Sequence, residues 1–239
     1  MAYANFNIID WHAISAGIES KDAWRQWQGN NFTWLQGEKA SVDKIPAMAR
    51  RRMSSLSKLA VQTALTLAQD QQVDYLIFAS RHGELTRTCA LLEDILKGED
   101  ASPIAFSQSV HNTAAGLFTI TAKKAIPVTS IVAGENTFHS ALIEAAAYLS
   151  DNSNDKVLVI DFDEPLPSHY QEFEQQEYQG YAFGLILSAG SEYSLQWNNK
   201  PANKHNEMPH GLQCISKLVG SPSEWMIESS SMQWIWTHK

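Results

Sequence analysis

Cysteine, glycine and proline are scarce in this sequence. It has two cysteines, 12 glycines and 8 prolines in 239 residues. Cys89 and Cys214 are too few and too far apart for a disulfide scaffold or a zinc site built from cysteines, so we expect a reducing compartment. The low glycine and proline content excludes collagen-like and low-complexity chains. With 44% hydrophobic residues, the chain has enough apolar side chains to form one packed core.

Long apolar runs and an excess of positive charge are also missing. The longest apolar stretches reach roughly ten residues, about half of what a membrane-spanning helix needs. No charged and then apolar leader opens the chain, so we expect a cytoplasmic protein without a membrane span. Eighteen Lys and Arg against 26 Asp and Glu give a net charge of −8. This balance excludes a general nucleic-acid binder, which needs a positive face for phosphate.

The hydrophobic pattern alternates between strand and helix periods. It predicts strands at 5–15, 73–79, 128–132, 156–161, 181–188 and 232–236, and helices at 53–68, 84–96, 107–123 and 136–149. The order from 73 to 161 indicates right-handed βαβ units in a mostly parallel sheet that is covered by helices. The tryptophan-rich stretch 24–34 is expected to be a packed insertion with little helix. Residues 191–239 are expected to be an irregular C-terminal extension.

The common sequence motifs of catalysis are absent. The sequence has no phosphate loop, HExxH zinc site, paired CxxC or GxSxG motif. Asp161 and Asp163 follow a buried strand, where carboxylates can hold magnesium beside a phosphorylated substrate. His82, His111 and His139 fall near predicted element ends, where sites often form.

Four segments of the chain, in this order and spacing, resemble the N-terminal half of β-ketoacyl synthases. They are RRMSSLSKLAVQTAL (51–65), SPIAFSQSVHNTAAGLFTI (102–120), TSIVAGENTFHSALIEAAAYL (129–149) and KVLVIDFDE (156–164). The resemblance covers about 45–190. It implies an α/β chain with half of a thiolase-like fold, a mixed five-stranded sheet covered by helices. Residues 1–239 would form a single truncated ketosynthase-like domain.

In that family a strand ends at a nucleophilic cysteine, whose thiolate lies at the positive N-terminus of the next helix. An ungapped register places Glu135 at this position, or Gly134 after a shift of one residue, and no cysteine lies within 130–142. A carboxylate cannot replace the thiolate as acyl carrier, because the anhydride it would form is far more labile than a thioester. The family's two catalytic histidines belong to a second half that we expect this chain to lack, and we assign His205, His210 and His238 no such role.

A ketosynthase half without its cysteine resembles a chain-length factor, and this chain is most similar to the aryl-polyene type. The resemblance implies a noncatalytic subunit that stabilises a catalytic ketosynthase in a heterodimer and shapes its acyl tunnel. A polyene bound to acyl carrier protein would be reached through the partner, with no cofactor and no metal. The residues expected at the tunnel and interface are Ala105, Phe106, Ser109, His111, Asn112, Ser130 and Val132.

Two alternatives keep catalysis in this chain. Glu135 could act as a general base with His111 or His139 in an independent thioester hydrolase. A carboxylate at a helix N-terminus is normally ionised and weakly basic, which makes this alternative less favourable. Asp161 and Asp163 could instead serve a magnesium-dependent phosphotransferase.

Overall fold

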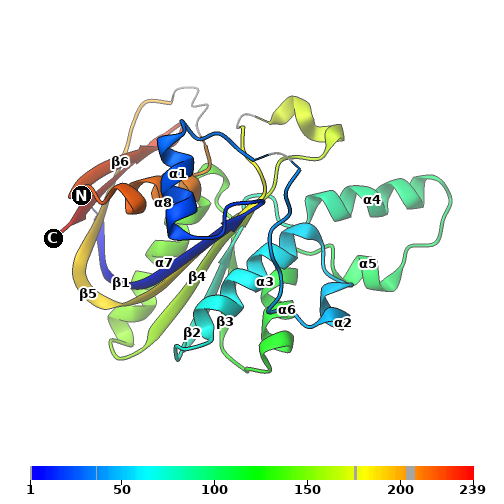
Figure 1. Ribbon diagram of the computed structural model, residues 1–239, viewed down its shortest axis with the longest axis horizontal. Coiled ribbons are helices and arrows are strands. Elements are labelled where there is room, and N and C mark those ends of the chain that lie inside the picture. Colours follow the sequence, from blue (N-terminus) through cyan, green and yellow to red (C-terminus); the bar gives the residue numbers. More distant parts are fainter. Residues whose placement is uncertain (1, 36, 175–176, 203–207) are drawn as a thin grey trace.

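A computed structural model describes residues 2–35, 37–174, 177–202 and 208–239 (Figure 1). Its strands are β1 (Ala2–Ser15), β2 (Tyr75–Ala79), β3 (Val128–Ile131), β4 (Lys156–Asp163), β5 (Tyr181–Asn199), β6 (Glu224–Glu228) and β7 (Met232–His238). Its helices are α1 (Lys21–Gly29), α2 (Ala47–Arg50), α3 (Ser55–Ala68), α4 (Leu85–Leu96), α5 (Pro103–Ser107), α6 (Thr113–Ala122), α7 (Thr137–Asp151) and α8 (His210–Gly220), with short 3-10 turns η1 (Gly134–Asn136) and η2 (Ser168–Phe173). None of the helices in these ranges is long and apolar enough to cross a membrane.

The strands form one mixed sheet, which confirms the expected α/β class. In the described ranges it has seven strands in the order β3-β2-β4-β5-β7-β6, with β1 also paired to β5. Strands β3, β2 and β4 are parallel, and the remaining pairs are antiparallel. Helices connect the parallel strands, as the alternating pattern predicts.

The expected strand number and the expected irregular end are both wrong. The unit β3-β2-β4-β5-β1 has the five expected strands, but β7 and β6 extend the sheet beyond it. Strand β7 pairs along the second half of β5, which is 19 residues long, and β6 pairs with β7. Residues 191–239 therefore contribute the end of β5, helix α8 and a β-hairpin in their described part. Strand β7 confirms the strand expected at 232–236, whereas β6 is only five residues long and depends on pairing with β7.

Strands β1 and β5 are long and bent, and both halves of β5 contribute to one core around α7 (Figure 1). Their pairing shifts register between Phe6 and Asn7 and again between Ile8 and Asp10. The side chain of Asn7 accepts a hydrogen bond from the backbone N–H of Glu192 at 3.0 Å. Bulges of this kind bend a strand and increase its twist. Phe138 of α7 consequently stacks on Trp236 of β7, with ring centroids 6.4 Å apart.

The sheet separates two hydrophobic clusters, because its side chains alternate between two buried faces. One cluster combines Ile77, Val159 and Leu187 with α7, α8 and α1. The other combines Phe78 and Ile160 with α3 and α6. The sheet is thus covered by helices on both faces, in agreement with the near-continuous apolar character of β2 and β4.

Two helical regions differ from the sequence-based expectations. Helix α1 lies in the tryptophan-rich stretch, where Ser20 caps it by accepting the N–H of Ala23 at 3.1 Å, and it buries Trp24 and Trp27. The stretch is packed as expected, but it is not poor in helix. The single helix expected at 107–123 is instead two, α5 and α6, separated by a turn at 108–112.

Candidate functional site

The expected nucleophile position lies at the junction between β3 and α7. After β3, Gly134 adopts a φ of +57°, a left-handed conformation that glycine tolerates best. The hydroxyl of Thr137 accepts the N–H of Ala133 at 2.9 Å and donates to the carbonyl of Gly134 at 2.7 Å. This turn places Glu135 in the 3-10 turn η1, directly before α7.

The Glu135 carboxylate is held by the protein. Its Oε2 accepts the backbone N–H of Ser230, in the turn between β6 and β7, at 2.7 Å. Burial raises the pKa of Glu135, but the hydrogen bonds from Ser230 and the charge of Arg81 outweigh this effect and lower the pKa below its ordinary value. The carboxylate is therefore ionised and weakly basic near neutral pH.

The same hairpin covers the first turn of α7. The indole N–H of Trp234 donates to Asn136 Oδ1 at 2.9 Å, and that of Trp236 donates to His139 Nε2 at 3.1 Å. The Nδ1 atoms of His139 and His210 lie 2.9 Å apart. His139 is fully buried, and its pKa lies well below the ordinary value because of burial and the neighbouring His210.

This arrangement does not support the hydrolase alternative. His139 uses both ring nitrogens on His210 and Trp236, so it has no free atom for a substrate. His111 donates Nε2–H to the carbonyl of Ser80 at 2.8 Å, and its ring lies against Gly83 in the loop after β2. Neither imidazole is hydrogen-bonded to Glu135 in the described part of the chain.

A cavity of about 20 Å³, enough for one water molecule, lies beside Glu135. Its lining includes Arg81, Asp161, Asp163, Tyr181 and His210. Burial, followed by the charge of Asp163, raises the pKa of Asp161 well above its ordinary value, and the hydroxyl of Tyr181 donates to Asp161 at 2.7 Å. Burial also raises the pKa of Asp163, to about 6.

The two aspartates are arranged as structural groups. Asp163 accepts hydrogen bonds from the hydroxyl of Ser80 at 2.8 Å, the N–H of Arg81 at 2.8 Å and the N–H of His82 at 3.2 Å. These contacts fix the loop after β2. Asp161 accepts the Tyr181 hydroxyl, and its raised pKa favours the protonated carboxyl, which is a poor magnesium ligand. No cluster of three potential metal ligands occurs among the described residues.

The residues expected at the tunnel and interface occupy two neighbouring parts of the chain. Ala105 and Phe106 lie on α5, Ala105 half-buried and Phe106 65% exposed. In the turn that follows, the Ser109 carbonyl accepts the hydroxyl of Thr88 at 3.1 Å, while Asn112 is exposed at the start of α6. Ser130 is half-buried on β3, and Val132 is exposed directly after it.

The edge strand β3 and the helices α4, α5 and α6 expose many apolar side chains. In the described ranges, β3 pairs only with β2, so its outer edge is unpaired. The exposed apolar residues are Leu92, Ile95, Leu96, Ile104, Phe106, Val110, Ile120, Val128 and Val132. Helices α4 and α5 project from the body of the molecule and carry several of them (Figure 1). We call β3, α4, α5 and α6 the β3 face. Large exposed apolar patches with an open strand edge are typical of interaction sites.

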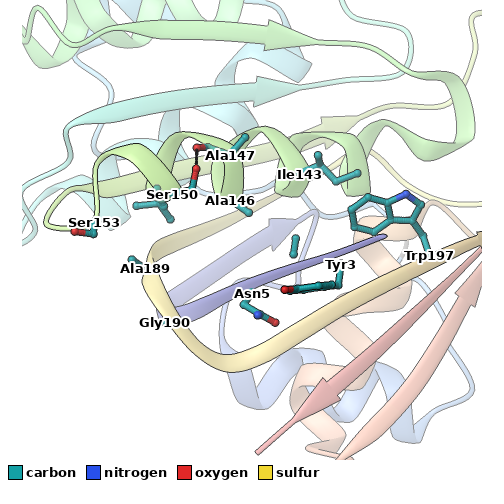
Figure 2. Close-up of a pocket in the computed structure, with 12 residues that line it drawn as sticks. Tyr3, Asn5, Ile143, Ala146, Ala147, Ser150, Ser153, Ala189, Gly190 and Trp197 are labelled. Atoms are coloured by element: carbon teal, nitrogen blue, oxygen red, sulfur yellow. Dashed lines mark hydrogen bonds between the residues drawn. The ribbon is translucent and has the colours of Figure 1, made fainter. Parts of the chain in front are cut away.

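A second hollow lies at the other end of α7, where β1 and β5 bend (Figure 2). It measures about 520 Å³ and is lined by uncharged side chains, among them Tyr3, Ile143, Ala146 and Trp197. It contains none of the expected site residues and is separate from the Glu135 junction.

The architecture agrees with a match to a known sequence family. The profile of the β-ketoacyl synthase N-terminal domain matches residues 24–237. The chain belongs to this family. No curated protein sequence matches it significantly.

Solved ketosynthase structures share this fold. One is a complex of the ketosynthase ApeO with its chain length factor ApeC from Xenorhabdus doucetiae, where the match has a TM-score of 0.87 and 29% identity and covers 98% of this chain and 99% of that one. The ishigamide ketosynthase/chain length factor matches with a TM-score of 0.65 and 14% identity, over 82% and 67% of the two chains. A β-ketoacyl synthase from Burkholderia phymatum STM815 matches with a TM-score of 0.62 and 13% identity, over 84% and 65%. The expected ketosynthase-like fold is confirmed.

Several residues at the junction have no role in the sequence-based hypothesis. They are Arg81, Tyr181, His210, Ser230, Trp234 and Trp236. From the sequence, the two tryptophans can be expected to be buried. Their hydrogen-bond partners cannot be predicted, because no sequence spacing connects them. Of the histidines to which no role is assigned, His238 stacks on Tyr193 at 4.3 Å, and His205 lies outside the described residues.

Proposed function

We propose that this protein is a noncatalytic chain-length factor of a heterodimeric β-ketoacyl synthase that acts in aryl polyene biosynthesis. The observation that carries the proposal is Glu135, a hydrogen-bonded carboxylate at the strand–helix junction where the sequence resemblance places the family's nucleophilic cysteine. The similarity to a chain in a complex of a ketosynthase with its chain length factor supports this role.

The chemistry of acyl transfer explains why Glu135 is not expected to take part. The nucleophile must attack a thioester and then hold the acyl group in a form that still reacts with a carbanion. A low-pKa carboxylate is a weak nucleophile, and this one is already bonded to Ser230. The role left for the chain is to stabilise the partner and to shape the tunnel that receives its acyl chain.

The β3 face is the surface that we propose for the ketosynthase partner. It combines an unpaired strand edge with exposed apolar side chains, Ile120 of α6 being 74% exposed. Obligate interfaces of this kind commonly bury more than about 2,000 Å² and are rich in apolar contacts. The partner would cover the edge that is otherwise open to aggregation.

We predict that this chain forms no covalent acyl adduct during turnover. Intact-protein mass spectrometry of the complex, supplied with acyl and malonyl carrier protein, should show the adduct on the partner's cysteine alone. The Glu135→Gln variant should leave the partner's adduct in place, since the amide oxygen can still accept the Ser230 N–H. An acyl adduct on this chain would contradict the noncatalytic role.

We also predict that the chain depends on its partner for solubility. Expression alone should give aggregated or unstable material, because the β3 face would be open to water. Co-expression with the ketosynthase should give a one-to-one complex on size-exclusion chromatography. A monodisperse, stable monomer in the absence of the partner would count against an obligate heterodimer.

Ala105 provides a test of tunnel shaping. If Ala105 lines the acyl tunnel at the interface, the Ala105→Phe variant should shorten the polyene, because a close-packed wall yields volume only at a strain of about 1–3 kcal/mol. The product lengths are measured by mass spectrometry after co-expression. Ala147→Phe, at an exposed position of α7 outside the β3 face, is the matched control and should leave the lengths unchanged. Unchanged lengths in an intact Ala105→Phe complex would remove Ala105 from the tunnel.

A further inference from the structure

A continuous chain of hydrogen bonds runs through His139 and His210. The indole N–H of Trp236 points at His139 Nε2 at 3.1 Å. His139 Nδ1 faces His210 Nδ1 at 2.9 Å, and His210 Nε2 lies 3.1 Å from the carbonyl oxygen of Glu228. This series of hydrogen bonds thus begins at the indole N–H of Trp236, which can only donate, and ends at the carbonyl of Glu228, which can only accept.

These two ends determine where the protons lie. Because Trp236 can only donate, His139 Nε2 must accept, and the proton of that ring lies on Nδ1. His210 Nδ1 must then accept it, which leaves the proton of His210 on Nε2, where it donates to the Glu228 carbonyl. Two neutral imidazoles with one proton each satisfy all three bonds. A further proton on either ring would bring two N–H groups face to face.

The chain holds the C-terminal segment against α7. Trp236 and Glu228 belong to the β6–β7 hairpin, and His210 begins α8, whereas His139 belongs to α7. Trp234 of the hairpin also stacks on His139, with centroids 4.4 Å apart and planes 7° from parallel. His139 is completely buried and His210 is 5% exposed. Opening this contact would bring both rings into water.

We propose that the His139–His210 pair is a proton-sensitive clasp, which holds the β6–β7 hairpin on α7 while both rings are neutral and releases it when one ring takes up a proton. The open hairpin would expose Glu135 and the N-terminus of α7, which come directly after strand β3 in the sequence. The clasp therefore connects pH to the part of the molecule beside the proposed partner surface.

The groups around the pair do not remove this sensitivity. Among the described residues, the titratable groups near the pair include Glu135 before α7, Asp161 and Asp163 of β4, Tyr181 of β5, Arg81 after β2, Cys214 of α8 and Glu228 of β6. The negative charge of Glu135 favours a positive charge on His210. A protonated His210 would carry a proton on Nδ1, however, and this atom faces His139 and not Glu135. Both histidines are neutral in the closed state, and in the open state their pKa returns to its ordinary value. The closed state is therefore destabilised as the pH falls below about 6.5.

Hydrogen exchange of the full chain, purified with its ketosynthase partner, tests the clasp. After correction for intrinsic exchange, amide protection in β6 and β7 should fall between pH 6.5 and 5.5 by about 5-fold if one ring ionises in the open state and by about 30-fold if both do, while protection in β4 does not fall. The double variant His139→Gln/His210→Gln should lose this difference. The control His169→Gln, which removes an exposed histidine, should keep it.

Equal loss of protection in the hairpin and β4, or a persistent fall in the double variant, would overturn the proposal. A measurement on the unmodified protein remains decisive should the double variant fail to fold. Side-chain ¹⁵N NMR at pH 8 should show the Nδ1–H tautomer at His139 and the Nε2–H tautomer at His210. The opposite tautomer at either ring would refute the hydrogen-bond chain.

Discussion

Introducing glutamates at Ile120 and Val132 should abolish the heterodimer. Both side chains are largely exposed, 74% for Ile120 and 59% for Val132, so charge is tolerated in the separate chain. In the proposed complex both positions would be covered, and each unpaired carboxylate would then be buried at a cost of several kcal/mol. We expect the affinity for the ketosynthase to fall at least about 100-fold, with loss of polyene formation.

Co-purification and sedimentation of the double variant with the ketosynthase measure this effect, and polyene absorbance reports activity. The matched control places glutamates at Tyr3 on β1 and Met226 on β6, two exposed apolar residues outside the β3 face. This control pair should still assemble and support synthesis. An intact complex of the Ile120→Glu/Val132→Glu variant would move the partner surface away from the β3 face.

Elements with a strong local pattern could be predicted from the sequence. Helix α3 carries an apolar face, and β4 contains an apolar run of four residues between Lys156 and Asp161. In each case burial follows directly from the residue pattern. The parallel order β3-β2-β4 also follows from the alternation of strands and helices.

Elements stabilised by distant contacts could not be predicted in this way. Helix α1 has only two buried residues, Trp24 and Trp27, and it depends on contacts such as the bond from Trp24 Nε1 to the Ala13 carbonyl at 2.8 Å. Strand β6 is five residues long and buries Trp225 and Ile227. A pattern this short is compatible with a strand or a loop, so pairing with β7 decides its structure.

The candidate site also has one part that could be predicted from the sequence and one that could not. The position of Glu135 follows from the resemblance to ketosynthases, and the structure places it between β3 and α7 as expected. Its surroundings do not follow, because Ser230, Trp234, Trp236 and His210 lie between 71 and 98 residues away from their partners in the sequence. Hydrogen bonds over such separations leave no spacing that a sequence pattern could reveal.

Gly211 is where a single methyl group should disturb the site most. A Cβ at this position of α8 would overlap Asp161 Oδ2 and lie 3.2 Å from the ring of Tyr181. Asp161 is fully buried and bonded to the Tyr181 hydroxyl, so it cannot move without leaving polar groups unsatisfied. The start of α8 must shift instead, and with it the adjacent His210. We expect Gly211→Ala to reduce the free energy of unfolding by about 3 kcal/mol, at the upper end for overpacking.

Urea denaturation of the co-purified complex, followed by the fluorescence of the tryptophans in β6 and β7, measures this loss. Gly220→Ala, at the other end of α8, is the matched control, because its Cβ would meet the amide end of Gln28 at 3.3 Å and otherwise only Pro222 Cδ at an ordinary 4.0 Å. The control should change stability by less than about 1 kcal/mol, since alanine is favoured over glycine in a helix. Because the displaced His210 would also break its bond to His139, hydrogen exchange in β6 and β7 should rise in Gly211→Ala already at pH 8. Equal stabilities of the two variants would show that α8 does not depend on close contact with Asp161.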